Sequence, residues 1–275
     1  MTLQRTKWIS HLVLLVYVAV VLYPLLFVFN SSFKGNSEIV LRPWSLPGTF
    51  QWDNYVNAFS SSHIGTYFLN SLYVSGLSTI IGILLATGIA YAVTRMKFPN
   101  VSKLVYGALL LSLLIPPVSL LIPLYIMIKD MGLYNTPFAL LVPYTAFGIP
   151  LSVFIIAAFL KSVPKELEEA GIVDGLTVYG LLGRIVLPLT TPTLVTVFIL
   201  NFMNHWNEYI MANLFLSSQS LRTLPVAVVQ FMDKFNMNYG ALCASVMISC
   251  IPVMIVYAVL QRKIIEGVTA GSVKG

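Results

Sequence analysis

The sequence predicts an all-α integral membrane protein that crosses the bilayer with six helices. Only 9% of the 275 residues are charged, 57% are apolar, and the mean hydropathy is +0.85. An average soluble domain carries about 25% charged residues, so this chain has too little charge to cover a soluble surface. An aromatic content of 12% also excludes a disordered chain. The positions of the few charges then locate the spans.

Each predicted span is a charge-poor interval of about 20 apolar residues, the length that crosses a bilayer as a helix. Proline removes a backbone hydrogen bond, so we expect breaks where prolines fall inside a span. Two interpretations of such breaks remain open: a hinge or pathway lining, and ordinary irregularity of spanning helices. The predicted spans cover residues 12–29, 68–93, 103–129, 137–159, 184–208 and 239–260. The expected breaks are at Pro116, Pro117 and Pro123 in the third span and at Pro143 and Pro150 in the fourth.

The lysines and arginines predict the orientation. With the N-terminus in the cytoplasm, eleven of the 16 basic residues lie inside and five outside, as the positive-inside rule requires. Both termini of this multi-pass protein are therefore expected in the cytoplasm. Basic residues do not cluster with aromatics, so no nucleic-acid partner is predicted. The outer segment 216–239 is polar, and it is either a contact surface for an external partner or a plain solvated loop.

The cytoplasmic connection over residues 162–188 is the most highly charged part of the chain. Ser162 is expected to cap a short helix, with Pro164 in its first turn and Gly175 as its stop. Leu167, Ala170, Gly171 and Asp174 share one face of that helix by spacing. A second short helix is expected over 177–185, followed by a turn into the fifth span at Leu187-Pro188. By spacing alone, the connection is either a surface helix or an element that docks into a partner.

Motifs in this connection resemble a known loop. Glu169-Ala170-Gly171, then Gly175, then Ile185-x-Leu187-Pro188 is similar to the EAA loop of ABC-importer permease subunits, with Gly171 in place of the usual alanine. The surrounding Pro-x-Glu-Leu-x-Glu-Ala-x-x-x-Asp-Gly resembles the carbohydrate-uptake branch of that family, and the C-terminal stretch from Gln261 resembles its maltose-transporter-type, six-span subunit.

The resemblance implies a type I ABC importer permease fold and an architecture in three parts. These are an N-terminal helix with an outer loop (1–67), a core domain (68–265) that contains the EAA loop (162–188), and a cytoplasmic tail (266–275). It implies a non-catalytic subunit of a sugar importer in a bacterial or archaeal cell membrane, with oligosaccharides as the expected cargo. The implied partners are a second permease subunit in a heterodimer, two cytoplasmic ATPases, an extracytoplasmic sugar-binding protein and the surrounding membrane lipid.

The resemblance also assigns contacts to the ATPase. The residues implied to couple to it are Glu166, Glu169, Ala170, Gly171, Asp174, Gly175, Ile185, Leu187 and Pro188. The sequence has no G-x-x-x-x-G-K-[S/T] phosphate loop, so ATP and Mg²⁺ are expected on the partner and no cofactor on this chain. No metal-ligand or catalytic constellation is predicted.

Polar residues at the end of the fifth span are candidates for sugar contact. Sugars are held by amide and carboxylate hydrogen bonds, and Asn201, Asn204, Asn207 and Glu208 recur at helical spacing. The alternative is that they mark the membrane boundary together with Trp206 and Tyr209. Importers of another polar solute, such as a glycerophosphodiester or a polyol, remain an alternative function. A secondary transporter is disfavoured because the one carboxylate within the predicted spans, Glu208, lies at the end of its span.

Overall fold

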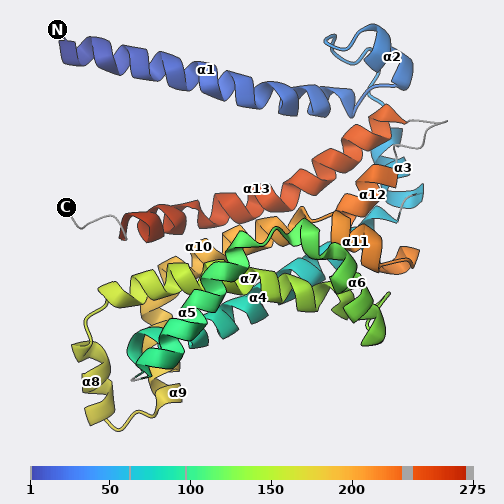
Figure 1. Cartoon of the computed structure of the whole chain (residues 1–275). Helices are drawn as coiled ribbons and strands as arrows, with labels where there is room; N and C mark the ends of the chain where they lie inside the picture. Colours follow the sequence, from blue (N-terminus) through green and yellow to red (C-terminus); the bar gives the residue numbers. More distant parts are fainter. Residues whose placement is uncertain (1, 62, 97, 231–237, 271–275) are drawn as a thin grey trace. The chain divides into compact units, whose positions relative to one another are not determined.

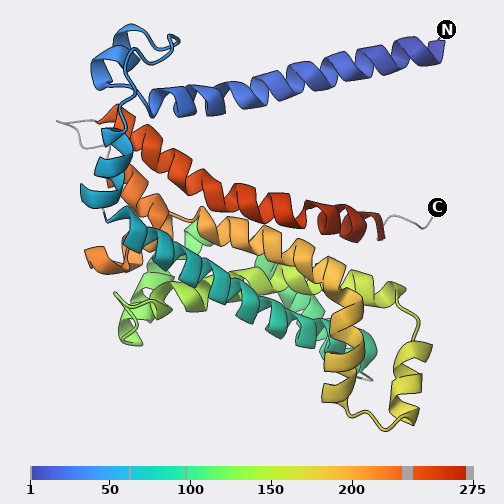
Figure 2. The same ribbon diagram turned by 180° about the vertical axis from the view of Figure 1, so that it is seen from behind.

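The computed structural model describes residues 2–61, 63–96, 98–230 and 238–270, and every regular element in these ranges is a helix (Figures 1 and 2). The chain divides into two compact units, one of residues 1–67 and 226–252 and the other of residues 68–225 and 253–275. The elements in chain order are α1 (Thr2–Ser31), α2 (Asn36–Leu41), α3 (Asp53–Ser61), α4 (Ile64–Arg95), α5 (Pro99–Leu114), η1 (Pro117–Leu120), α6 (Leu121–Asp130), α7 (Phe138–Ser162), α8 (Glu166–Val173), α9 (Val178–Leu181), η2 (Leu182–Val186), α10 (Leu187–Trp206), α11 (Ile210–Phe215), η3 (Gln219–Leu221), α12 (Leu224–Gln230) and α13 (Tyr239–Ala270).

Within the described residues, five helical segments are long and apolar enough to cross a membrane, and one bent pair of helices gives a sixth. The charge-poor intervals of the sequence correspond to these segments. The five are residues 8–31, 64–95, 138–162, 178–206 and 239–259, and the bent pair is 99–114 with 117–130. The fifth span begins earlier than expected, at Val178 instead of Arg184, because the second half of the EAA-like loop continues directly into it.

The third span is broken, as expected, at one of its prolines. Helix α5 ends at Leu114, Ile115 and Pro116 are extended, and the two arms meet at 94°. Proline disfavours helical geometry in the residue before it, which explains the extended conformation of Ile115. Pro117 starts η1, and Pro123 lies in the first turn of α6, where its missing N–H breaks no helical bond. Pro123 therefore does not break the span.

The expected break of the fourth span is wrong. Helix α7 continues through Pro143 and Pro150 for 25 residues. Both prolines are buried among neighbouring side chains of the bundle. A membrane helix tolerates proline where neighbouring helices hold the surrounding backbone in place. Packing around the two prolines therefore keeps α7 helical despite the backbone hydrogen bonds that they remove.

The core of the second unit lies between α4, α7 and α10, which run side by side in both views (Figures 1 and 2). Small residues of α4 meet branched residues of α7: Ala86 and Ala90 are fully buried against a cluster that includes Val153 and Ile156. Small side chains let helix backbones approach closely in a membrane, where packing replaces the hydrophobic effect as the driving force. This three-helix core positions one end of α4 and α7 against the charged loop.

The first unit is organised around a buried lysine. The Lys34 ammonium donates to the carbonyl oxygens of Arg42 at 3.1 Å and Pro43 at 3.2 Å, and to the Ser45 hydroxyl at 3.3 Å. Asn54 donates to the carbonyl of Lys34 at 2.9 Å. These bonds compensate a fully buried charge and hold the segment that follows α1 in a fixed turn. In the outer segment 216–239, residues 231–237 lie outside the described residues. In the predicted tail, residues 266–270 continue α13, and residues 271–275 lie outside the described residues.

Candidate functional site

The loop that follows α7 starts differently from the expectation. Ser162 is the last residue of α7, and its hydroxyl donates to the Phe159 carbonyl at 2.7 Å, so it does not cap the next helix. Helix α8 begins only at Glu166, after Pro164, without a side-chain cap. Three glutamates occupy its first turn, where the helix dipole favours negative charge. This dipole interaction stabilises the start of α8 in place of a serine cap.

The end of α8 conforms to the expectation. Gly175 has a φ of +79°, the left-handed conformation that glycine adopts without strain. The Leu176 N–H bonds to the Gly171 carbonyl at 2.9 Å and the Gly175 N–H to the Ile172 carbonyl at 3.0 Å. These two bonds form a Schellman motif, which satisfies the last carbonyls of the helix and reverses the chain.

Gly171 faces the second half of the loop. A Cβ built on it would lie 2.6 Å from Cδ1 of Ile185 and 2.8 Å from Cδ2 of Leu181. The residues of the EAA-like motif that are far apart in the sequence, Gly171 and Ile185, therefore pack on each other and join α8 to the start of the fifth span. Gly171 consequently does not share an outward face with Leu167, Ala170 and Asp174.

The expected turn at Leu187-Pro188 is absent. Residues 182–186 form a π-helix, and the Leu187 N–H bonds back to the Leu182 carbonyl, so the chain enters α10 without leaving helical geometry. Pro188 has no N–H to donate, and one wider turn before it accommodates the missing bond. Thr177 accepts a hydrogen bond from the Gly180 N–H at 3.4 Å and caps the first turn of this continuous segment.

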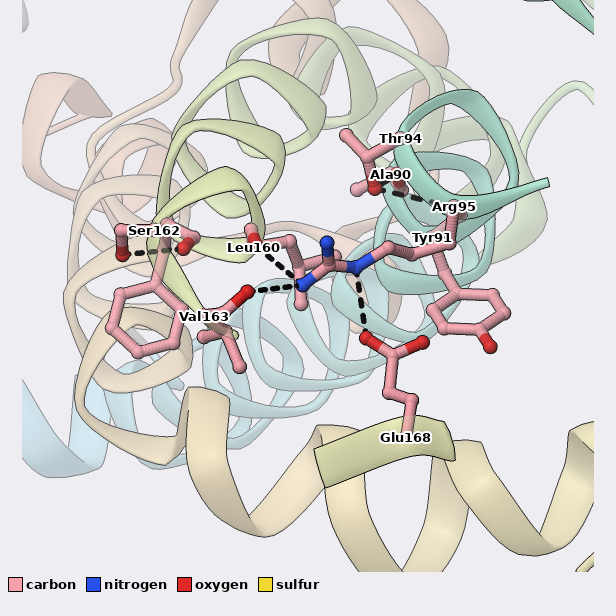
Figure 3. A network of polar contacts seen from close by, with 9 residues as sticks. Ala90, Tyr91, Thr94, Arg95, Leu160, Ser162, Val163 and Glu168 are labelled. Atoms are coloured by element: carbon pink, nitrogen blue, oxygen red, sulfur yellow. Dashed lines mark hydrogen bonds and ion pairs between the residues drawn. The ribbon is translucent and has the colours of Figure 1, made fainter. Parts of the chain in front are cut away.

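A buried ion pair fastens α8 to the ends of two spans (Figure 3). Nε of Arg95, the last residue of α4, lies 2.8 Å from Oε1 of Glu168, and the two side chains are only 7% and 10% exposed. The same guanidinium donates from Nη2 to the carbonyls of Leu160 and Val163 at the end of α7, both at 2.7 Å. The ring of Tyr91 lies beside the carboxylate (Figure 3). We call this set of contacts the Arg95 clamp; no motif or spacing in the sequence predicts it.

The opposite side of α8 is exposed. Glu166, Glu169, Ala170 and Asp174 all face outward. Large apolar side chains lie among them, with Val173 87% and Tyr179 of α9 86% exposed. An exposed apolar surface bordered by acids is typical of an interaction site on a protein. Of the other residues implied to couple, Pro188 is exposed, and Ile185 and Leu187 are half-buried.

A cavity of about 340 Å³ lies in the second unit between α7, α10 and α11. It brings together three of the four predicted sugar-contact residues, Asn201, Asn204 and Glu208; Asn207 does not line it and donates to the Met203 carbonyl instead. Two ring side chains that line the cavity were not among the predicted contacts, because neither motif nor charge marks them. These are Tyr144 and His205, whose rings stack with centroids 5.0 Å apart.

Several polar groups of the cavity are already bonded within the chain. The Glu208 carboxylate accepts from the Tyr144 hydroxyl at 2.7 Å and from the Met211 N–H at 2.8 Å, which caps α11. Asn201 is buried and donates to the Ser152 hydroxyl at 2.8 Å. Asn204, in contrast, is exposed. Glu208 and Asn201 thus build the wall of the cavity through bonds within the chain, whereas the Asn204 side chain is exposed at its surface.

Comparison with known proteins identifies relatives across nearly the whole chain. Residues 78–266 match the family of the binding-protein-dependent transport system inner membrane component. The chain is 38% identical to a probable ABC transporter permease protein, YurM, of Bacillus subtilis, over 99% of this chain and 89% of that protein. It is 33% identical to the diacetylchitobiose uptake system permease protein NgcG of Streptomyces coelicolor (98% and 89%) and 33% identical to the trehalose transport system permease protein SugB of Mycobacterium tuberculosis (94% of each).

The fold is similar to that of a solved transporter. A chain in the crystal structure of a bacterial ABC transporter involved in the import of the acidic polysaccharide alginate superposes with a TM-score of 0.82. The two chains are 21% identical, and the alignment covers 94% of this chain and 96% of the other. The chain therefore has the fold of an importer permease.

We predict that breaking the Arg95 clamp from one side destabilises the protein strongly. Arg95→Gln leaves the Glu168 carboxylate buried without its partner, which costs about 3–5 kcal/mol. The paired change Arg95→Met with Glu168→Leu removes both charges and should recover part of that loss, because the carbonyls of Leu160 and Val163 still lack their donor. Thermal unfolding of the detergent-purified protein measures the difference. Equal stability of the wild type and the single variant would contradict the importance of the clamp.

Substitution by alanine at two glycines of the loop should change the stability of the protein to different extents. Gly175→Ala forces a side chain into the left-handed region and should cost about 1–2 kcal/mol. Gly171→Ala meets only the flexible ends of three side chains and gains helix propensity of about 1 kcal/mol, so we expect little net change. Gly183→Ala is the control, since its added Cβ would meet no atom within 4 Å. Unfolding midpoints of the three variants test this order, and a harmless Gly175→Ala would refute the role of the turn.

Proposed function

The chain belongs to the family of binding-protein-dependent transport system inner membrane components, and from this membership we propose that it is the permease subunit of an ATP-driven sugar importer. The relatives support a carbohydrate cargo: their names include uptake of diacetylchitobiose, trehalose, and melibiose, raffinose and stachyose. Oligosaccharides are therefore the substrate class that we favour. One relative is the permease protein of a sulfoquinovosyl glycerol transport system, so glycosylated polyols are the alternative substrate class.

The importer that we propose contains four further components. They are a second permease subunit, two copies of a cytoplasmic ATPase that bind ATP and Mg²⁺, and an extracytoplasmic sugar-binding protein. In the solved alginate transporter, a periplasmic protein loaded with an alginate pentasaccharide is part of the complex. This precedent supports a corresponding binding protein for the present chain.

Coupling to the ATPase is proposed to run through the exposed side of α8. Glu166, Glu169, Ala170 and Asp174 would contact the ATPase, while Gly171, Ile185 and the Gly175 turn hold the two halves of the loop together. When two ATPases close on ATP, the docked helix moves with them. Transmission of this movement to the spans requires a stiff connection. Coupling depends on an element with two states, and its equilibrium must be shifted both from the ATPase end and from the membrane end. The Arg95 clamp is the observation that carries this proposal, since it ties α8 to the ends of α4 and α7.

Sugar is proposed to pass the cavity between α7, α10 and α11. Asn204 would contact it through its exposed amide, and the stacked rings of Tyr144 and His205 offer an aromatic wall of the kind that sugar sites use. Glu208 and Asn201 would act by shaping this wall. Asn207, which lies outside the cavity, is not assigned a contact.

We predict that Glu169→Ala uncouples the importer. The variant should reach the membrane, because Glu169 is exposed and supports no internal contact that we identify among the described residues. In vesicles that contain the whole importer, ATP-driven sugar uptake should fall at least tenfold. Asp130→Asn, an exposed acid at the end of α6, is the control and should transport normally. Normal uptake by both Glu169→Ala and Gly175→Ala would refute the coupling assignment.

The cavity residues should separate substrate contact from structure. Asn204→Ala loses one hydrogen bond to the sugar, worth about 1 kcal/mol, and should raise KM for uptake about fivefold without lowering stability. Glu208→Ala removes the acceptor for Tyr144 and for the start of α11, so it should lower the unfolding midpoint. Asn207→Ala removes one exposed hydrogen bond outside the cavity and is the matched control, for which KM should not change. If Asn207→Ala raises KM as much as Asn204→Ala, the cavity is not the pathway.

A further inference from the structure

A second hollow of the second unit lies at the same end of the bundle as the EAA-like loop. It has a volume of about 330 Å³ and is formed by the end of α4, the first half of α5 and the end of α7. Lys103 and Lys161 both line it, together with the polar groups of Thr94, Ser102 and Tyr106. No Asp or Glu lines it. The hollow therefore combines two positive charges with hydroxyl groups in one place.

One wall of the hollow is a single face of α5. Lys103, Tyr106, Gly107 and Leu110 line it at spacings of three and four residues. Gly107 leaves open space at the middle of this face, since a Cβ built there would meet no atom within 4 Å. The basic and hydroxyl groups lie toward the start of α5 and Leu110 lies deeper along the helix. The wall consequently changes from polar to apolar along its length.

The second lysine is held in place by aromatic rings. Nζ of Lys161 lies 5.3 Å from the ring centroid of Tyr106, a cation–π arrangement. The Tyr106 ring in turn packs edge-on against Phe154 of α7, with centroids 4.6 Å apart. The neighbouring cation, Arg95, is neutralised by Glu168. Their ion pair is the one found among the described residues. The charges of Lys103 and Lys161 are thus uncompensated by carboxylates in this part of the chain.

The outer surface of α5 next to the hollow is apolar. Helix α5 has no buried residue, and Leu104, Leu111 and Leu114 are 74%, 64% and 77% exposed. An occupant with a negative head and hydrocarbon chains would match both regions: its phosphate would lie between the lysines, and its chains along these leucines. Basic pockets between spanning helices on the cytoplasmic side bind anionic lipid head groups for this reason.

We propose that the hollow between α4, α5 and α7 is a binding site for an anionic phospholipid, whose phosphate is held by Lys103 and Lys161. Occupation would link the start of α5 to the ends of α4 and α7, the two helix ends that the Arg95 clamp also joins. The location in the cytoplasmic leaflet rests on the orientation in the proposed function. The binding itself requires neither sugar nor ATP.

The test titrates the detergent-purified importer, with all its subunits, with phosphatidylglycerol and counts bound lipid by native mass spectrometry. Each charge near a membrane surface contributes about 1 kcal/mol, so Lys103→Gln or Lys161→Gln should weaken binding about fivefold and the double variant about 30-fold. A double Lys→Arg variant should retain binding. Lys129→Gln with Lys165→Gln removes the same charge elsewhere and is the matched control.

Two further arms distinguish the source of the phosphate and the role of charge. Phosphatidylcholine should bind at least tenfold more weakly than phosphatidylglycerol, and an excess of inorganic phosphate should not displace the lipid. Unchanged phosphatidylglycerol binding in the double Lys→Gln variant would overturn the proposal, as would displacement by phosphate alone. ATP-driven uptake is measured after the same preparation has been reconstituted into lipid vesicles. If uptake is absent while lipid binding depends on the two lysines, the transport function is refuted and the lipid site stands.

Discussion

The guanidinium of Arg95 connects three segments that are far apart in the sequence, and the arrangement of the loop depends on it. It reaches from the end of α4 to two carbonyls at the end of α7 and to the carboxylate of Glu168 in α8. The two nitrogens and three oxygens concerned lose water on folding, and their contacts with one another compensate for that loss. Because the bonds converge from different directions, α8 cannot shift without breaking charge-assisted contacts in a buried place. Its other side remains free for a partner.

This constraint gives the loop two different faces with different tasks. The inner face is closed by the clamp and by Gly171 packing on Ile185 and Leu181, so the loop is continuous with α10 through the π-helical turn. The outer face presents acids and exposed apolar side chains to the solvent. In the function that we propose, force applied to the outer face reaches α4, α7 and α10 together. Tyr144 of α7 and Asn204 of α10 line the cavity, so these same helices would change the shape of the sugar pathway.

Much of the fold was predictable because the bilayer imposes simple rules. Charge-poor intervals located the spans, Pro116 marked the bend of the third, and Gly175 marked the end of α8 through its need for a positive φ. Features that arise from tertiary contact were not predictable. Glu168 cannot be told from its neighbours Glu166 and Glu169 until Arg95 is placed beside it, and the prolines of α7 break no helix because their neighbours bury them. Similarly, Glu208 looked like a sugar ligand in the sequence, and only the structure showed that it caps α11.

The central claim is that α8 moves with the spans as one body. The direct measurement is the distance between spin labels on Val173 of α8 and Ala158 of α7, two exposed positions, in a chain whose two cysteines are replaced by serine. In the assembled importer, the distribution of this distance should have one narrow peak at the same value with and without ATP. The peak should broaden when Arg95 is changed to glutamine. A distance that changes on ATP binding in the otherwise unaltered chain would contradict the account, because α8 would then move independently of the helix to which it is clamped.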